Sequence, residues 1–313
     1  MHSVYHNIFL RNSSTGLFIF QKCIYLILFN HLLACEYEKT SSEKNTFRTI
    51  QYTDDYGNKV TLKKNVSRVL SLSPSVTEIL CAVCDTSVII GKTPYCNYPT
   101  YIKSKPTVSS YPINREQILA LRPDVVFVKK DMFSESDLKE LNRLDIPVYS
   151  MRFDGIEDVL RNIVVIGEIT GYKKKSQTLC DSLRAEIEKL KSLPCTHKPS
   201  VLLLISKSEL YAFGYKSYAT ELIDVACAKQ AVDSTFAEAF PRLTQEYILK
   251  INPDVIIGGK HVGLETDFFV LYPALKRTKA FINKKIFSMD EDLLSRPGPR
   301  IAETIITIRK FIK

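Results

Sequence analysis

Two cysteines of this 313-residue chain, Cys81 and Cys84, have the CxxC spacing of thiol redox centres and of half a metal site. The pair lies inside the apolar helical stretch SVTEILCAVC, with no turn, aromatic or proline residue between the two cysteines. Such surroundings favour thiols that pack as small hydrophobic side chains. The residues leave two interpretations open, a buried structural pair and a redox or metal pair, and they favour the first.

Histidine, the usual general base and transition-metal ligand, is scarce in this chain. Of the 5 histidines, only His197 and His261 lie beyond the first 34 residues. No P-loop, GxSxG, HExxH or strand-linked GxGxxG motif occurs either. We therefore expect no enzyme activity, no resident metal ion and no cofactor.

The composition is that of a globular protein, with 45% hydrophobic and 25% charged residues. Because 43 basic residues face 34 acidic ones, the net charge is +9, which fits nucleic acid, an anionic membrane or an anionic ligand equally well. The clearest basic run, Lys173–Lys175, begins a helical pattern and has no interleaved aromatic residues. We interpret this run as a solvated helix face and expect no nucleic-acid partner.

The N-terminal segment has the composition of a bacterial export signal. Residues 1–34 contain no Asp or Glu, and an apolar stretch that is too short for a comfortable membrane span follows Arg11 and Lys22. Residues 32–35, LLAC, resemble a lipobox in which Cys35 is lipidated and becomes the mature N-terminus. We expect a signal peptide at 1–34, a flexible tether at 35–46, and an exported protein anchored to a membrane in the periplasm or at the cell surface. An uncleaved apolar anchor is the alternative.

Removal of the leader changes the cysteine count. Besides Cys35, six cysteines remain, which can form up to three disulfides: Cys81, Cys84, Cys96, Cys180, Cys195 and Cys227. Their pairing cannot be read from the sequence.

An internal repeat organises the remainder of the chain. The segment NREQILALRPDVVFV at 114–128 recurs as TQEYILKINPDVIIG at 244–258. Each copy begins with a residue that can cap a helix, Asn114 or Thr244, and continues as a short amphipathic helix that must end before a proline. A continuous apolar run follows in each copy, as is typical of a strand covered on both faces.

Further segments continue this alternation of strands and helices, which indicates parallel sheets in an α/β architecture. Strands are predicted at 69–72, 88–90, 146–149, 201–205 and 286–289, and helices at 75–84 and 218–227 and from Ile301 onward. Between the halves, residues 172–193 form one amphipathic pattern of about 33 Å, which is long enough to join two lobes. We predict an N-terminal lobe at 47–171, a connecting helix at 172–193 and a C-terminal lobe at 194–313.

Several motifs occur in a characteristic order: RVLSLSPSVTEIL, GKTPYCNYP, NREQILALRPD, the connecting helix, FPRLTQEYIL and DEDLLSRPGPR. In this order the chain resembles the bacterial substrate-binding proteins of ABC importers that bind cobalamin and iron chelates, and it is most similar to the cobalamin-binding branch. The resemblance covers residues from about Phe47 to the C-terminus. It implies two α/β lobes joined by a rigid helix, with the ligand between them and limited closure on binding.

The resemblance also implies a ligand site. A corrin is a broad ring edged with amides, so its receptor needs aromatic walls and a few polar groups. By motif position, Tyr95 and Tyr111 are expected to face the cleft from the first lobe, and Tyr211 and Phe240 from the second. Asp292 and Arg296 correspond to the polar edge of the site, although a structural ion pair is the simpler interpretation of the last two. Arg300 is expected in the first turn of the last helix.

Two further glutamates, Glu116 and Glu246, occupy equivalent positions in the repeat. In the resembled family these acids dock against arginines of the membrane permease, while the simpler interpretation is stabilisation of a helix N-terminus. The implied partners are the permease and ATPase of an importer and a corrinoid or iron chelate, and we expect the binding protein to be a monomer.

One departure from the resembled family concerns the ligand. Lys129 and Lys130 directly follow the strand at 125–128, where cobalamin binders often have an aromatic residue, so an anionic iron chelate, a ferric siderophore or a haem stays open as an alternative to cobalamin. Two functions of other classes also stay open, a thiol-redox protein and a passive surface lipoprotein without a ligand.

Overall fold

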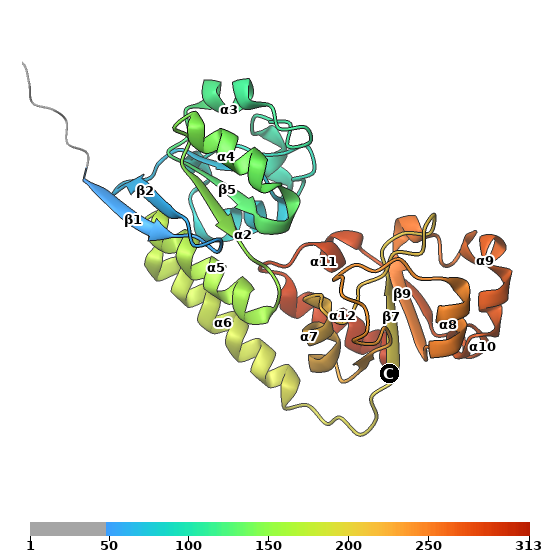
Figure 1. Ribbon diagram of the computed structural model, residues 1–313. Helices are drawn as coiled ribbons and strands as arrows, with labels where there is room; N and C mark the ends of the chain where they lie inside the picture. The colour runs from blue at the N-terminus through green and yellow to red at the C-terminus, as the bar shows by residue number, and fades with distance from the viewer. Residues whose placement is uncertain (1–47) are drawn as a thin grey trace, which may run out of the picture. The chain divides into compact units, whose positions relative to one another are not determined.

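The computed structural model describes residues 48–313, which contain two four-stranded parallel sheets and one antiparallel hairpin (Figure 1). The first sheet has the order β4-β3-β5-β6, with β3 at Val69–Ser71, β4 at Ile89–Gly91, β5 at Val125–Lys129 and β6 at Val148–Met151. The second has the order β10-β9-β7-β8, with β7 at Ser200–Leu204, β8 at Lys229–Gln230, β9 at Val255–Gly259 and β10 at Ile286–Met289. The hairpin joins β1, Thr49–Thr53, to β2, Lys59–Lys63.

The helices that surround the sheets are α2 at Pro74–Val83, α3 at Arg115–Leu121, α4 at Glu135–Arg143, α5 at Ile156–Ile169, α6 at Lys173–Lys191, α7 at Ala219–Val225, α8 at Gln245–Ile251, α9 at Phe268–Leu271, α10 at Lys279–Ile282, α11 at Glu291–Ser295 and α12 at Ile301–Ile312. Short 3-10 turns lie at Thr86–Val88, Thr100–Ser104, Lys130–Met132, Lys260–Val262 and Pro273–Arg277. None of the helices within residues 48–313 combines the length and the apolar character needed to cross a membrane. The predicted signal peptide, the tether and Cys35 lie outside the described residues.

The internal repeat folds alike in both of its copies. The Asn114 side chain accepts a hydrogen bond from the backbone N–H of Gln117 at 3.0 Å, and the Thr244 hydroxyl accepts one from Tyr247 at 3.1 Å. These bonds cap α3 and α8, because the first N–H groups of a helix have no partner within it. Both helices end before the prolines of the repeat, as the sequence predicted.

The aspartate after each repeat proline has one structural role. Asp124 Oδ2 accepts hydrogen bonds from the backbone N–H groups of Ser67 and Arg68, both at 3.0 Å, and Asp254 Oδ2 accepts one from Ser200 at 2.9 Å. Each carboxylate therefore holds the segment that leads into the neighbouring parallel strand, β3 or β7. Each copy of the repeat thus supplies a capped helix, a turn and an aspartate that binds the neighbouring strand segment.

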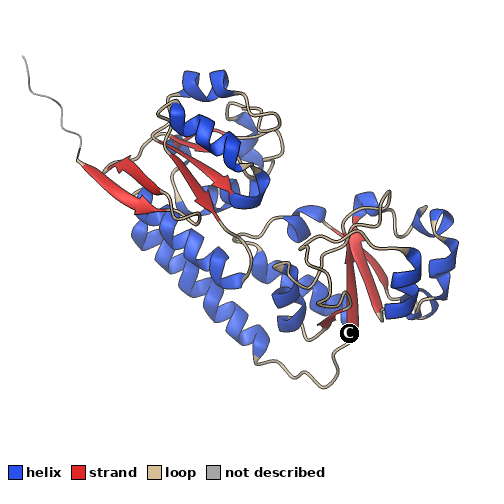
Figure 2. Cartoon of the chain, in the orientation of Figure 1, coloured by secondary structure: helices blue, strands red, loops and turns tan. Residues whose placement is uncertain are grey.

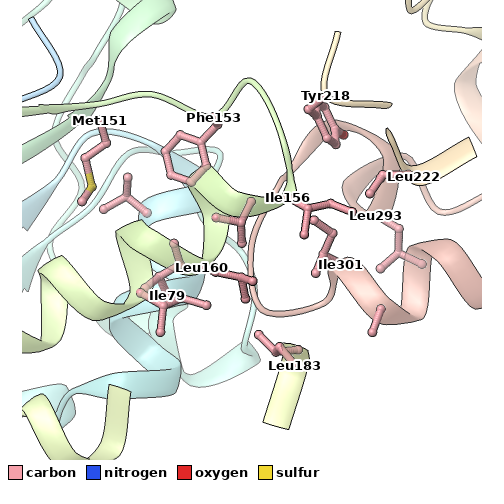
Figure 3. Packing of buried hydrophobic residues seen from close by; sticks show 14 of the residues in the cluster. Ile79, Met151, Phe153, Ile156, Leu160, Leu183, Tyr218, Leu222, Leu293 and Ile301 are labelled. Carbon is pink, nitrogen blue, oxygen red and sulfur yellow. The ribbon is translucent and has the colours of Figure 1, made fainter. Parts of the chain in front are cut away.

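The strands have apolar side chains on both faces because each sheet is covered on both sides. In β5, Val125 and Phe127 join a central cluster, whereas Val126 and Val128 join a cluster under α3 and α4. Alternate residues of β7 and β9 divide in the same way between the central cluster and a third cluster. The central cluster includes residues of both sheets and of α2, α5, α6, α7 and α12, and Figure 3 shows side chains of α5 and α6 near those of α7 and α12.

The predicted connecting helix is α6, and it lies alongside α5, a helix that the sequence analysis did not predict (Figure 2). Their close approach depends on Gly167, since a Cβ atom there would lie 2.0 Å from the Ser176 hydroxyl oxygen. Glu221 of α7 accepts a hydrogen bond at 2.7 Å from the backbone N–H of Ile156, at the start of α5. The predicted architecture of two parallel α/β sheets with a long helix between them is confirmed, while the exact lobe boundaries stay a prediction.

Candidate functional site

Two motifs that are distant in sequence meet at the side chain of Arg296, which lies between α11 and α12. Its guanidinium donates to Asn97 Oδ1 at 2.6 Å and to the carbonyl oxygen of Tyr95 at 3.0 Å, both in GKTPYCNYP. It also pairs with Asp292 Oδ1 at 2.6 Å within DEDLLSRPGPR. Arg296 therefore fixes the relative position of these two motifs.

Next to this contact, the carboxylate of Glu78 in α2 binds the side chains of two arginines. Arg300 donates from Nε to Oε2 at 2.8 Å and from Nη2 to Oε1 at 2.7 Å, while Arg296 Nη1 lies 3.4 Å from Oε1. The Glu78 side chain is only 3% exposed, and the guanidinium of Arg300 stacks over the Tyr98 ring at 4.1 Å. A carboxylate buried this deeply needs such partners, because desolvation penalises an unpaired charge.

Sequence reasoning missed Glu78, which it treated only as part of an apolar helix. The available signal was one acid inside an otherwise apolar run, together with two arginines four positions apart in a later loop. Arg300 is the N-cap residue of α12, one position before the first turn in which it was expected.

The four predicted aromatic residues all keep part of their surface exposed. Tyr95 and Tyr111 are 65% and 91% exposed, and Tyr211 and Phe240 are 36% and 39% exposed. Large aromatic rings with this much free surface can stack on a planar ligand. The Phe240 ring also packs edge-on against Phe213, with the centroids 5.6 Å apart.

The structure brings some of the predicted ligand residues together. Tyr95, Asp292 and Arg296 are linked by the contacts of the guanidinium, and Tyr211 and Phe240 lie on adjoining segments, because Ala212 N–H donates to the Pro241 carbonyl at 3.1 Å. Tyr111 has no hydrogen bond or ring contact to the other five within residues 48–313. Their role in ligand binding stays a prediction.

The two lysines that depart from the resembled family are both engaged by the protein. Lys129 Nζ lies 3.1 Å from Asp131 Oδ2, and its side chain is 13% exposed. Lys130 Nζ lies 4.6 Å from the centre of the Tyr56 ring, and the Tyr56 hydroxyl donates to the Lys130 carbonyl oxygen at 2.6 Å. The ion pair of Lys129 reduces the argument for an anionic ligand, whereas Lys130 keeps its positive charge over the Tyr56 ring.

The glutamates predicted to dock on a permease both lie exposed in the first turns of their helices, Glu116 in α3 and Glu246 in α8. Hydrogen bonds from its own backbone N–H and from the Thr244 hydroxyl lower the pKa of Glu246, so this group is negatively charged at neutral pH. No ion pair to another described residue engages either carboxylate. Both charges are therefore available to a partner.

The CxxC pair is buried within α2 and its end, as the favoured interpretation predicted. Cys81 and Cys84 are free thiols with 8% and 3% of their surface exposed. Burial raises the pKa of Cys81 to about 11 and also raises that of Cys84. A thiol redox centre needs a lowered pKa and access to solvent, so these properties oppose redox chemistry at Cys81 and Cys84.

The one disulfide within residues 48–313 joins Cys195 to Cys227, which answers part of the question of cysteine pairing that the sequence left open.

A cavity of about 610 Å³ lies beside α7. Ile156, Lys191, Tyr215 and Glu221 are among its lining residues, and none of the six predicted ligand residues contributes to it. The candidate site therefore consists of the residues around Arg296 and the exposed aromatic rings, and it does not include this cavity.

Two parallel α/β sheets joined by a long helix are the architecture of a periplasmic-type binding protein, and the chain belongs to the Periplasmic binding protein family, whose model matches residues 69–293. It is 29% identical over 88% of its length to an uncharacterized ABC transporter substrate-binding lipoprotein of Bacillus subtilis (strain 168), YvrC, covering 90% of that protein. It is 25% identical to the vitamin B12-binding protein of Vibrio parahaemolyticus, covering 78% of this chain and 88% of that one. Among solved structures, a possible iron-binding (periplasmic solute-binding) protein from Staphylococcus epidermidis superimposes with a TM-score of 0.69 at 26% identity, covering 80% of this chain and 99% of that chain. The predicted resemblance is thus confirmed at the level of the family.

Proposed function

We propose that this protein is a lipid-anchored substrate-binding protein of an ABC importer, which captures a corrinoid and delivers it to the permease and ATPase. The meeting of GKTPYCNYP with DEDLLSRPGPR at Arg296 carries this proposal. These are the two motifs at which the resemblance locates one aromatic wall and the polar edge of a cobalamin site. The names of the Bacillus and Vibrio relatives support both the transport role and the ligand.

The chemistry of the exposed side chains suits a corrin. Tyr95 and Tyr111 offer ring faces from one half of the chain, and Tyr211 and Phe240 offer them from the other. Apolar contact with these rings supplies affinity, while a few polar groups set the orientation of the ligand. No covalent step belongs to this function, and the protein acts by binding alone.

Asp292 and Arg296 form the polar edge of the proposed site. The Asp292 carboxylate keeps 23% of its side chain exposed, so it can accept hydrogen bonds from ligand amides. The Arg296 side chain is 9% exposed and already directs its donors to Asn97, Tyr95 and Glu78. Arg296 therefore acts mainly by holding Asp292 and the Tyr95 loop in place beside the ligand.

Haem or a ferric siderophore is the second candidate ligand, with the same transport role. The Staphylococcus structure, described as a possible iron-binding protein, favours this alternative. The ion pair of Lys129 with Asp131 weighs against it, because the charge of this lysine is already matched within the protein.

Export and anchoring form part of the proposal. Lipidation of Cys35 in the LLAC segment would attach the chain to a membrane through the tether at 35–46. The disulfide Cys195–Cys227 supports an oxidising compartment, since such bonds are rare in the cytosol.

Equilibrium dialysis against cyanocobalamin, haem and a ferric siderophore tests the ligand. Saturable binding of cyanocobalamin at the lowest concentration supports the corrinoid proposal, and preference for either iron compound supports the alternative. Absence of saturable binding to all three would contradict the proposed ligand class and favour a passive lipoprotein.

A further inference from the structure

A basic segment covers one end of the second half of the chain. Residues 268–289, from α9 to the end of β10, contain no Asp or Glu. They contain these basic residues: Lys276, Arg277, Lys279, Lys284 and Lys285. Neither the family motifs nor the proposed ligand site includes this segment, and we call its exposed part the basic end.

Most of these charges have no acidic partner. Lys279 lies 3.6 Å from Asp254, but no ion pair with a described residue engages the other four. Just before this segment in the sequence, Glu265 accepts a hydrogen bond from the backbone N–H of Ser288 at 3.1 Å, and Asp267 pairs with Lys207 at 2.7 Å. Glu265 keeps its negative charge and lines the same groove as Lys276 and Lys284, but the four cations without an ion pair outnumber it, so the basic end has an excess of positive charge.

Apolar side chains of the same segment are also exposed. Ile282 is 66% exposed, and Val270 and Leu271 are 74% and 55% exposed. Ile282 also lines a groove of about 570 Å³ together with Lys276 and Lys284. The α9 and α10 helices, which carry these residues, lie at the same end of the second half (Figure 1). Aliphatic groups are thus exposed beside unpaired cations.

Exposed aliphatic side chains beside lysines favour one class of binding partner over another. Single-stranded nucleic acid would need free aromatic faces for base stacking, yet the two aromatic rings of the groove, Phe269 and Phe281, pack on each other with centroids 4.7 Å apart. Lysines around exposed aliphatic side chains are instead the features that bind an anionic bilayer, where cations meet the headgroups and apolar groups enter the interface. We infer that the basic end binds the surface of an anionic phospholipid membrane.

This inference rests on the proposed function in one respect, since a membrane-anchored protein meets such a surface continuously. The tether at 35–46 would allow the folded part to lie on the bilayer by its basic end. The contact is weak by itself, because it lacks inserted acyl chains, and it depends on charge. It therefore weakens as salt screens the headgroups.

Amine-reactive footprinting of the full chain, followed by mass spectrometry, tests the inference. The chain is mixed with vesicles of phosphatidylcholine alone or of phosphatidylcholine with phosphatidylglycerol, so that any attachment by the N-terminus is common to both. We expect modification of Lys276 and Lys284 to slow by roughly fivefold only on the anionic vesicles and to recover at high salt. The exposed lysines Lys64, Lys103 and Lys216 serve as internal controls and should react equally on both.

Two sets of substitutions distinguish binding through the basic end from nonspecific attraction of a basic protein to anionic vesicles. Replacing Lys276, Arg277, Lys284 and Lys285 by Gln should abolish the excess co-sedimentation with anionic over neutral vesicles. The matched variant with Lys64, Lys103, Lys139 and Lys216 replaced by Gln removes the same charge and should retain most of that excess. Ile282→Ser should reduce the protection of Lys276 while all lysines remain.

Equal modification of Lys276 on both vesicles, or equal loss of binding in both Gln variants, would overturn the inference. Protection that requires importer proteins in the vesicles, and not lipid alone, would overturn it in favour of a protein partner. Ligand dialysis measures the proposed transport function separately, so failure of one does not imply failure of the other.

Discussion

The carboxylate of Glu78 and the guanidinium of Arg300 form two hydrogen bonds, of 2.8 Å and 2.7 Å. Glu78 lies in α2, beside the first sheet, and Arg300 lies at the start of α12, in the second half of the chain. Because the Glu78 side chain is 3% exposed, this pair is a buried charged contact between the two halves. It lies next to the Arg296 contacts and supports the geometry of the candidate site.

Removing the Glu78 carboxylate should destabilise the protein strongly. Glu78→Ala leaves Arg296 and Arg300 without their shared acid, and breaking a buried ion pair costs about 3 to 5 kcal/mol in the free energy of unfolding. Urea denaturation measures the loss. Glu303→Ala, at an exposed acid of α12, is the control and should change stability by less than about 1 kcal/mol. Equal stability of the two variants would contradict the structural role of Glu78.

Removing an exposed aromatic ring at the candidate site should weaken ligand binding. Tyr111→Ala and Phe240→Ala are each expected to lower affinity for the ligand by about tenfold, because each loses apolar contact and stacking worth about 1 to 2 kcal/mol. Tyr215→Ala removes a tyrosine that is 51% exposed in the cavity beside α7 and should leave affinity unchanged. Equilibrium dialysis gives the three dissociation constants. Unchanged binding in both test variants would remove these residues from the site.

Reversing the two repeat glutamates should separate binding from transport. Glu116→Lys combined with Glu246→Lys should preserve ligand affinity, since both residues lie in exposed first turns of α3 and α8. Uptake by cells should fall to background, because the introduced lysines would repel the arginines expected on the permease. Glu186→Lys with Glu303→Lys makes the same change in net charge elsewhere. Normal uptake with the first pair would refute docking through these acids.

The repeat aspartates should contribute to stability in a pH-dependent way. Burial alone would raise the pKa of Asp124, but hydrogen bonds from Lys63 and from the backbone of Ser67 outweigh it and lower the pKa below its ordinary value. The pKa of Asp254 is lowered in the same way, against burial, by hydrogen bonds from Ser200. Stability from these carboxylates is therefore present above the pKa of an unfolded aspartate and is lost as pH falls through the lower folded value.

Asp124→Asn should accordingly lower the free energy of unfolding at neutral pH and flatten its decline in acid. Urea titrations from neutral pH to below pH 4, a range set by the ordinary aspartate pKa of about 3.9, measure both effects. Asp181→Asn, at an exposed position of α6, should change neither. A decline in acid that is as steep for Asp124→Asn as for the unmodified chain would show that the linkage is absent.

The buried thiols should resist alkylation in the native protein. With the pKa of Cys81 at about 11, little thiolate exists at neutral pH, and burial limits access as well. Iodoacetamide followed by peptide mass spectrometry should label Cys81, Cys84, Cys96 and Cys180 only after denaturation. Cys195 and Cys227 should need a reductant in addition. Rapid native labelling of Cys81 would revive the redox interpretation.

Periodicity and local hydrogen bonding explain why much of the fold was predictable. The caps at Asn114 and Thr244, the prolines that follow their helices and the apolar runs after them are properties of neighbouring residues. Helix α5 was missed although it is as regular as α6, and it depends on Gly167 to approach its neighbour. A glycine needed for close helix packing carries no local signal of that need.

The sequence by itself determined the family, the repeated unit, the alternation of strands and helices, and the candidate aromatic and acidic residues, because each follows from residue types at short spacing. Only the tertiary structure decided that Arg296 reaches Asn97, that Glu78 receives two arginines, and which cysteines are bonded. Those contacts join residues far apart along the chain. They depend on how the two sheets and α6 pack around the central cluster, which no stretch of neighbouring residues specifies.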